Sequence, residues 1–219
     1  MELKRVVVTG LGAITPLGND VQTTWNNAKE GVSGAGPITH FDASQFKTQF
    51  ACEVKGFNPA DHFDRKKERQ LDLYAQYALV AARQAVADAG LADESIDHNR
   101  VGVIVAAGIG GLHTFEEEAG YYALTGAEKG PKYNPFFIPK MIADIASGHI
   151  SMEFGFHGPN YGVVSACASS NNAIIDAFNY IRLGKADAFV TGGAEAAIFP
   201  AGVGGFKSRH ALSPRNDSP

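Results

Sequence analysis

A single cysteine lies where an apolar run changes into a helical pattern. Residues 161–166 predict a short apolar strand, which breaks at Cys167 into a helix that continues to Leu183. Serines and asparagines crowd the first turn of this helix: Ser169, Ser170, Asn171 and Asn172. The free N–H groups at a helix start favour a thiolate over a thiol, and they can also bind an oxyanion. The pattern therefore indicates a nucleophile for acyl transfer.

The chain has two cysteines, and their surroundings differ. Cys167 lies between Ala166 and Ala168, small residues that leave the sulfur approachable, although a buried core thiol is the commoner role of a free cysteine. Cys52 lies in an alternating, strand-like run next to Glu53, whose negative charge disfavours a thiolate. We therefore expect Cys167 to be the reactive thiol.

The composition is typical of a soluble α/β protein, with 45% hydrophobic and 19% charged residues among 219. This length is sufficient for one large domain with a sizeable core. A net charge of −4 gives no reason to expect a nucleic-acid partner. The two cysteines form neither a disulfide framework nor a metal site, and no apolar run reaches the ~18 residues of a membrane span. The expected location is the reducing cytoplasm, with no membrane partner.

The order of the predicted elements favours an α/β fold. Residues 6–10, 101–108 and 188–191 are apolar runs that predict buried strands. Helical patterns lie between them, from Asp20 to Gly31, Glu68 to Ala89, Met141 to Gly155 and Cys167 to Leu183. Strands that alternate with helices predict a parallel or mixed sheet with helices on both faces. A dinucleotide site is disfavoured, because Gly10 and Gly12 supply only two of its three glycines.

Several separate motifs occur in an order that resembles a known enzyme family. They are VVVTGLGAITPLG from residue 6, SACASS around Cys167, VTGGAEAA from residue 190 and GVGGFKSRHALSPRND from residue 202. Together they resemble the β-ketoacyl-acyl carrier protein synthases, most nearly the synthase II type of bacterial fatty acid synthesis. The resemblance implies a thiolase-like α/β fold, with residues 1–219 as its N-terminal half and the C-terminal half absent.

The resemblance also implies a reaction, that of a 3-oxoacyl-acyl carrier protein synthase of type II fatty acid biosynthesis. Cys167 would take an acyl group from acyl carrier protein, and malonyl-carrier protein would then be decarboxylated and condensed with that group. Family members supply two histidines, a lysine and a phenylalanine from their second half. None of the seven histidines here lies in a matching motif, so we expect this chain alone to be inactive. No metal or organic cofactor is implied.

Three other interpretations stay open. Synthase I shares this chemistry and differs in its chain-length preference. Another thiolase-like acyltransferase, such as a polyketide or mycolic acid synthase, would differ in substrate. A non-catalytic partner like the chain-length factors of polyketide systems generally lacks the nucleophile, and Cys167 is present.

Candidate substrate-binding residues lie at the ends of predicted elements. Ile109 follows the strand at 101–108, and ligands collect at the carboxyl ends of strands in α/β sheets. Phe136 and Phe137 precede an apolar helix, so they belong either to the core or to an acyl pocket. Phe206 ends a glycine-rich run from residue 200, which predicts a mobile loop that carries a side-chain gate.

The resemblance further implies two protein partners. Carrier proteins are acidic, so Lys66 and Arg69 in the basic run 64–69 are expected to contact one, although Gln70 stands where synthase II enzymes often have another basic residue. The second partner is another copy of the chain. In that homodimer the strand before Cys167 would lie near the two-fold axis, and Phe136 or Phe137 would reach the other subunit's pocket.

Overall fold

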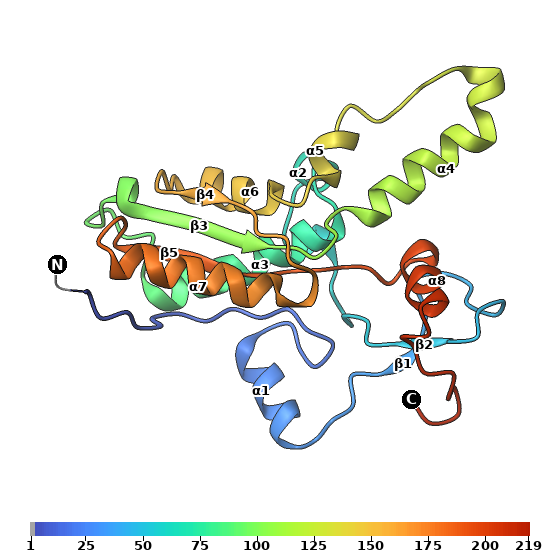
Figure 1. The fold of residues 1–219 in the computed structure, drawn as a ribbon, viewed down its shortest axis with the longest axis horizontal. Coiled ribbons are helices and arrows are strands. Elements are labelled where there is room, and N and C mark those ends of the chain that lie inside the picture. Colours follow the sequence, from blue (N-terminus) through green and yellow to red (C-terminus); the bar gives the residue numbers. More distant parts are fainter. Residues whose placement is uncertain (1–2) are drawn as a thin grey trace.

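A computed structural model describes residues 3–219, and a three-stranded parallel sheet forms its centre (Figure 1). The strands are β3 (Val101–Ala106), β4 (Asn160–Tyr161) and β5 (Ala188–Gly193), in the order β4-β3-β5. All six residues of β3 are buried, as expected of a continuous apolar run between two other strands. The predicted strands at 101–108 and 188–191 are therefore confirmed.

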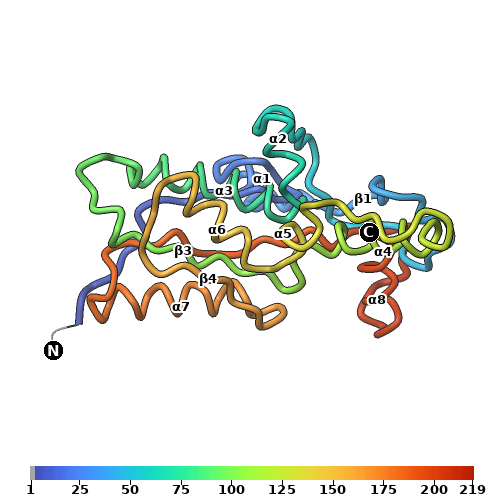
Figure 2. Tube along the Cα trace, turned by 90° about the horizontal axis from the view of Figure 1, so that it is seen from above, coloured from blue at the N-terminus to red at the C-terminus, as the bar shows by residue number. Residues whose placement is uncertain are grey.

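Helices cover both faces of this sheet, as predicted. Helix α7 (Ser169–Arg182) packs on one face against β3 and β5. Helices α3 (Leu73–Ala89) and α6 (Ile145–Phe154) pack on the other, and Figure 2 shows the sheet between these two layers. The largest core cluster lies between α3, α6 and β3, with Tyr74, Leu79 and Ile150 fully buried.

Helix boundaries follow the capping residues that the sequence contains. Helix α1 (Val21–Lys29) begins after Asp20, whose side chain accepts a hydrogen bond from the Thr23 N–H. Helices α3 and α6 end at Gly90 and Gly155, which adopt the left-handed conformation with φ of 61° and 65°. Capping thus fixed these ends as the sequence predicted.

The other elements lie around this centre. Two short strands, β1 (Gly36–Pro37) and β2 (Phe50–Ala51), form a separate antiparallel pair. Helix α4 (Leu112–Lys129), which the sequence did not predict, projects away from the sheet and leads back through α5 (Phe137–Met141) (Figure 1). Single 3-10 turns occupy Pro59–Asp61, His98–Arg100 and Ala166–Ala168. Across residues 3–219, no helix combines the length and apolarity that a bilayer crossing requires.

The predicted strand at 6–10 is wrong. Residues 3–14 form no ladder, and the side chains of Val7 and Val8 are 60% and 80% exposed. Two of the N–H groups just after it, those of Leu11 and Ala13, donate to the side chains of Asp88 and Gln84 on α3. A strand needs a neighbouring strand to pair with. Strand β5 lies at an edge of the sheet, and a cavity of about 460 Å³ lies between it and residues 10–16.

The predicted strand at 161–166 is also wrong beyond its first residue. β4 pairs with β3 only through Asn160 and Tyr161. Beyond Tyr161, the buried hydroxyl of Ser147 binds the backbone of β3 where β4 would otherwise continue to pair. This hydroxyl accepts a hydrogen bond from the Val105 N–H at 2.9 Å and lies 3.1 Å from the Val105 carbonyl oxygen. A side chain on α6 therefore ends this strand early.

Two further predictions need correction. The helix expected from Glu68 is interrupted: α2 (Arg65–Glu68) ends first, and Asp72 then caps α3, which starts at Leu73. The buried Asp72 carboxylate also accepts from the Thr114 N–H and hydroxyl, so a contact with α4 fixes the break. The glycine-rich run that ends at Phe206 is a helix, α8 (Pro200–Ser208), which begins with proline at its first position.

Candidate functional site

Cys167 lies in a tight turn immediately before α7. The 3-10 turn Ala166–Ala168 runs directly into the first residue of the helix, Ser169. Ala166 has a φ of +51°, which is unusual for a residue with a side chain and strains the backbone next to Cys167. The side chain of Cys167 is exposed. The turn therefore presents a sulfur atom to solvent at the start of a helix.

The polar residues of the first helical turn hold this conformation. The Ser169 hydroxyl accepts from the Ser165 N–H at 2.8 Å and donates to the Ala166 carbonyl at 2.6 Å. The Asn172 side chain donates to the Ser165 hydroxyl at 2.7 Å. Ser170 packs directly against the backbone of Gly193 at the end of β5. The serine and asparagine pattern thus fixes the turn that carries Cys167.

Three chain segments converge beside this turn, at the carboxyl ends of β3 and β5. The Glu195 carboxylate, two residues after β5, accepts hydrogen bonds from the N–H groups of Ile109 at 2.7 Å and Gly110 at 3.2 Å. Gly108 lies between Glu195 and the turn that carries Cys167: a Cβ added to Gly108 would be 2.9 Å from Glu195 Oε2 and 3.6 Å from the Ala166 carbonyl oxygen. Glu195 lies within the motif VTGGAEAA, and its residue type and spacing alone predicted no role for it.

Among the predicted site residues, Ile109 lies in the loop beside the Cys167 turn, whereas the three phenylalanines lie at the start of α5 and on α8. Ile109, in the converging loop, and Phe206, on α8, are 43% and 46% exposed. Phe136 and Phe137 are half-buried, and Phe137 stacks on Tyr133 with ring centres 5.4 Å apart. These aromatic residues lie on the α4–α5 excursion rather than in the main core.

A cavity of about 1080 Å³ is lined by basic residues of the run 64–69 and by one of the candidate phenylalanines. Its lining includes Lys66, Arg69 and Phe136, together with Arg65 and Lys140. Cys167, Ile109 and Phe206 do not line it. The predicted carrier-protein residues and the predicted nucleophile therefore do not share this cavity.

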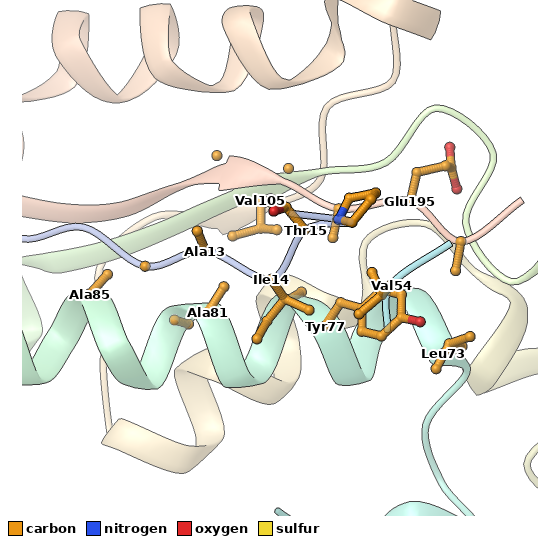
Figure 3. A pocket seen from close by; sticks show the side chains of 18 of the residues that line it. Ala13, Ile14, Thr15, Val54, Leu73, Tyr77, Ala81, Ala85, Val105 and Glu195 are labelled. Carbon is orange, nitrogen blue, oxygen red and sulfur yellow. The ribbon is translucent and has the colours of Figure 1, made fainter. Parts of the chain in front are cut away.

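The smaller cavity lies between the unpaired N-terminal segment and the sheet. Figure 3 shows Ala13, Ile14 and Thr15 on one side, with the side chains of α3 below them. Val105 and Glu195 border the same space, and Cys52 also lines it. Both cysteines of the chain are exposed, so accessibility does not separate them.

The basic run 64–69 contains one lysine that turns inward. Lys66 and Arg69 are exposed, whereas Lys67 Nζ lies 3.1 Å from Nδ1 of the buried His149 on α6. Burial lowers the pKa of Lys67, and burial together with the Lys67 charge lowers the pKa of His149 to about 4. A neutral His149 therefore accepts a hydrogen bond from Lys67, which joins α2 to the core.

Comparison with known families identifies the chain. Residues 3–218 match the sequence model of a family described as beta-ketoacyl synthase, N-terminal domain. This chain belongs to that family. The 3-oxoacyl-[acyl-carrier-protein] synthase 2 of Staphylococcus aureus (strain COL) is 46% identical over 215 residues, which are 98% of this chain and 51% of that relative. The chain thus spans about half the length of the curated relatives that it matches.

Solved structures confirm the thiolase-like α/β fold expected of a β-ketoacyl synthase. The ishigamide ketosynthase/chain length factor superposes with a TM-score of 0.88 and 30% identity, over 97% of this chain and 52% of that chain. A second similar structure, AntDE:AntF, is described as a type II PKS acyl-carrier protein in complex with its ketosynthase bound to the hexaketide. It superposes with a TM-score of 0.79 and 25% identity, over 94% of this chain and 55% of that chain.

Proposed function

We propose that this chain is the N-terminal half of a 3-oxoacyl-acyl carrier protein synthase and carries its acyl-accepting nucleophile, Cys167. The observation that supports this most directly is the strained, exposed turn that presents Cys167 at the start of α7. The 46% identity to a curated 3-oxoacyl-[acyl-carrier-protein] synthase 2 supports the reaction class.

In the first step, the Cys167 thiolate attacks the carbonyl carbon of an acyl thioester on carrier protein. A sulfur–carbon bond forms, the carrier thiolate leaves and takes a proton, and the acyl group stays on Cys167 as a new thioester. The exposed position of the sulfur suits attack on a substrate that a second protein delivers.

In the second step, malonyl-carrier protein loses CO₂, and the resulting enolate attacks the Cys167 thioester carbonyl. A carbon–carbon bond forms, Cys167 leaves as thiolate, and the product is a 3-oxoacyl-carrier protein. The enolate needs hydrogen-bond donors that we assign to the second half of the enzyme, which makes residues 1–219 an incomplete site.

We also assign the acidic carrier protein to the surface around Lys66 and Arg69. Both side chains are exposed, and both border a cavity whose lining includes two more cations, Arg65 and Lys140. The AntDE:AntF structure supports a carrier-protein partner for this family, because it contains a ketosynthase and a carrier protein together. Ile109, Phe136, Phe137 and Phe206 remain our candidates for the acyl path.

The enzyme is proposed to be a homodimer that works in the cytoplasm. Apolar side chains of α7 and the segment before Cys167 are exposed, which suits a subunit interface: Val164, Ile174, Ile175 and Phe178. A nucleophilic thiol needs a reducing compartment, and both cysteines are free. Synthase I or a polyketide-type acyltransferase would use the same nucleophile and would differ in substrate. A chain-length-factor role is less well supported, because Cys167 is present.

Complementation tests this proposal. The chain would be coexpressed with the remaining half of the Staphylococcus aureus synthase 2, and malonyl-dependent elongation of acyl-carrier protein would be measured. We expect elongation that Cys167→Ala abolishes and Cys52→Ala leaves unchanged. Elongation that survives in Cys167→Ala would refute the assignment of the nucleophile.

A further inference from the structure

The loop that follows β3 is held by a single carboxylate. Ile109 and Gly110 are consecutive residues, and both of their N–H groups point at Glu195. Two successive N–H groups that bind one anion form a small anion-binding concavity, and hydrogen bonds to an ionised acceptor are stronger than those between neutral groups. Gly110 has a φ of +84°, which allows this geometry.

The opposite side of the same loop is packed without spare room. The Gly111 N–H donates to the Met141 carbonyl at 3.0 Å. A Cβ added to Gly111 would lie 2.5 Å from the Lys140 carbonyl oxygen, and one added to Gly110 would lie 3.0 Å from Ala143 Cα. The loop is therefore wedged between the end of α5 and Glu195, and glycine backbone makes most of these contacts.

The loop also lies beside the turn that carries Cys167. Gly108 lies beside both Glu195 Oε2 and the carbonyl of Ala166, the residue before Cys167. Ile109, the next residue, is the first one after β3 with a large side chain. A shift of this loop would therefore move Ile109 relative to the Cys167 sulfur.

We propose that Glu195 is a positioning residue, whose carboxylate holds the 108–111 loop against the Cys167 turn and so sets how an acyl chain passes Ile109 to reach the sulfur. This inference rests on the proposed function, because it takes Cys167 as the acyl acceptor. Glu195 touches neither the substrate nor the reacting atoms in this scheme. Its effect should therefore depend on the length of the chain that approaches Cys167.

Alkylation with two maleimides tests this on the 219-residue chain itself. N-methylmaleimide reports the access of a small reagent to Cys167, and N-octylmaleimide also needs room for a long alkyl chain. Second-order rates would be measured at Cys167 by peptide mass mapping, for the wild type, Glu195→Ala, Glu195→Gln and the control Glu94→Ala, which removes an exposed carboxylate elsewhere.

We expect the octyl-to-methyl rate ratio to change roughly tenfold in Glu195→Ala, because this variant lacks the acceptor of the hydrogen bonds from both the Ile109 and the Gly110 N–H groups. Glu195→Gln keeps one acceptor oxygen, so its rate ratio should lie between those of Glu195→Ala and the wild type. The control Glu94→Ala should have the same rate ratio as the wild type. Hydrogen exchange at the Ile109 and Gly110 amides should accelerate in Glu195→Ala.

Two results would overturn the inference. One is an unchanged ratio in both Glu195 variants, and the other is an equal loss of rate with both reagents, which would show a general structural role. If Glu195→Ala does not fold, the Glu195→Gln ratio decides. Failure of the proposed function would look different: wild-type Cys167 would react no faster than Cys52 with either reagent.

Discussion

Two apolar runs of this chain have similar sequences and different structures. Residues 6–10 and residues 161–166 are both rich in valine, and both predict apolar strands. Neither forms a ladder over its predicted length. The second run is nevertheless fixed, because Ser147 and Ser169 bind its backbone. In the first run, Val7 and Val8 are exposed, and a cavity begins at its last residue, Gly10.

This comparison shows that a β-branched run specifies a strand only where another strand edge is within reach. Side chains can replace part of the ladder, as Ser147 does, and they then determine where the chain turns. The run before Cys167 gains a defined turn in this way, whereas the hydrogen bonds nearest to residues 6–10 are those that the Leu11 and Ala13 N–H groups donate to α3.

The largest expected difference is one of activity. If the Cys167 turn is formed and the rest of the site is missing, the 219-residue chain should show no malonyl-dependent elongation of acyl-carrier protein above a blank. Radiolabelled malonyl-carrier protein would provide the measurement. Condensation by this chain alone would contradict the division of the site between two halves.

A stability test separates the two apolar runs. Ser147→Ala removes the partner of Val105 and Tyr161 backbone groups in the interior, and we expect it to lower the free energy of unfolding by about 2–4 kcal/mol. Val8→Thr, in the exposed run, should change it by less than ~0.5 kcal/mol. Urea denaturation followed by circular dichroism would measure both. Equal effects would mean that the N-terminal run is as well fixed as the Cys167 segment.

A pH test examines α6, the helix that supplies Ser147. His149 has a folded pKa of about 4, below its ordinary value of 6.5, so the unfolded state binds more protons between these values. Stability should therefore fall as the pH decreases from ~6.5 towards 4, by up to about 3 kcal/mol. His149→Asn should flatten this part of the profile, measured as urea midpoints against pH. An unchanged slope would place the titrating group elsewhere.

The next effect concerns the two thiols. Limiting iodoacetamide should label Cys167 roughly tenfold faster than Cys52, because Cys167 lies at a helix start and Cys52 lies next to Glu53. Peptide mass mapping gives the order, and urea should erase the preference. Faster labelling of Cys52 in the folded chain would show that the turn around Cys167 does not activate it.

The smallest effect is expected at the surface. In the complemented enzyme, Lys66→Glu with Arg69→Glu should raise the apparent KM for carrier-protein substrates several-fold and spare small thioesters, since charge reversal at a rim acts mainly on encounter. Lowering the salt concentration should enlarge the difference. Equal losses with both substrate types would show that the cluster serves the fold.

The sequence by itself determined the features that depend on local chemistry. Asp20, Gly90 and Gly155 fixed helix ends through capping and left-handed backbone, and the apolar run 101–106 fixed the central strand. Cys167 and the polar residues after it were sufficient to predict a cysteine at the start of a helix, the position from which we propose that it acts as a nucleophile.

Only the tertiary structure decided the features that depend on a distant partner. Pairing of residues 6–10 requires a neighbouring strand, which residues 3–219 do not place beside them. The early end of β4 depends on Ser147, the break before α3 depends on Thr114, and the loop beside Cys167 depends on Glu195. Each of these bonds joins residues far apart in the chain. Local propensity and spacing carry no information about such contacts, because they form only when packing brings the two segments together.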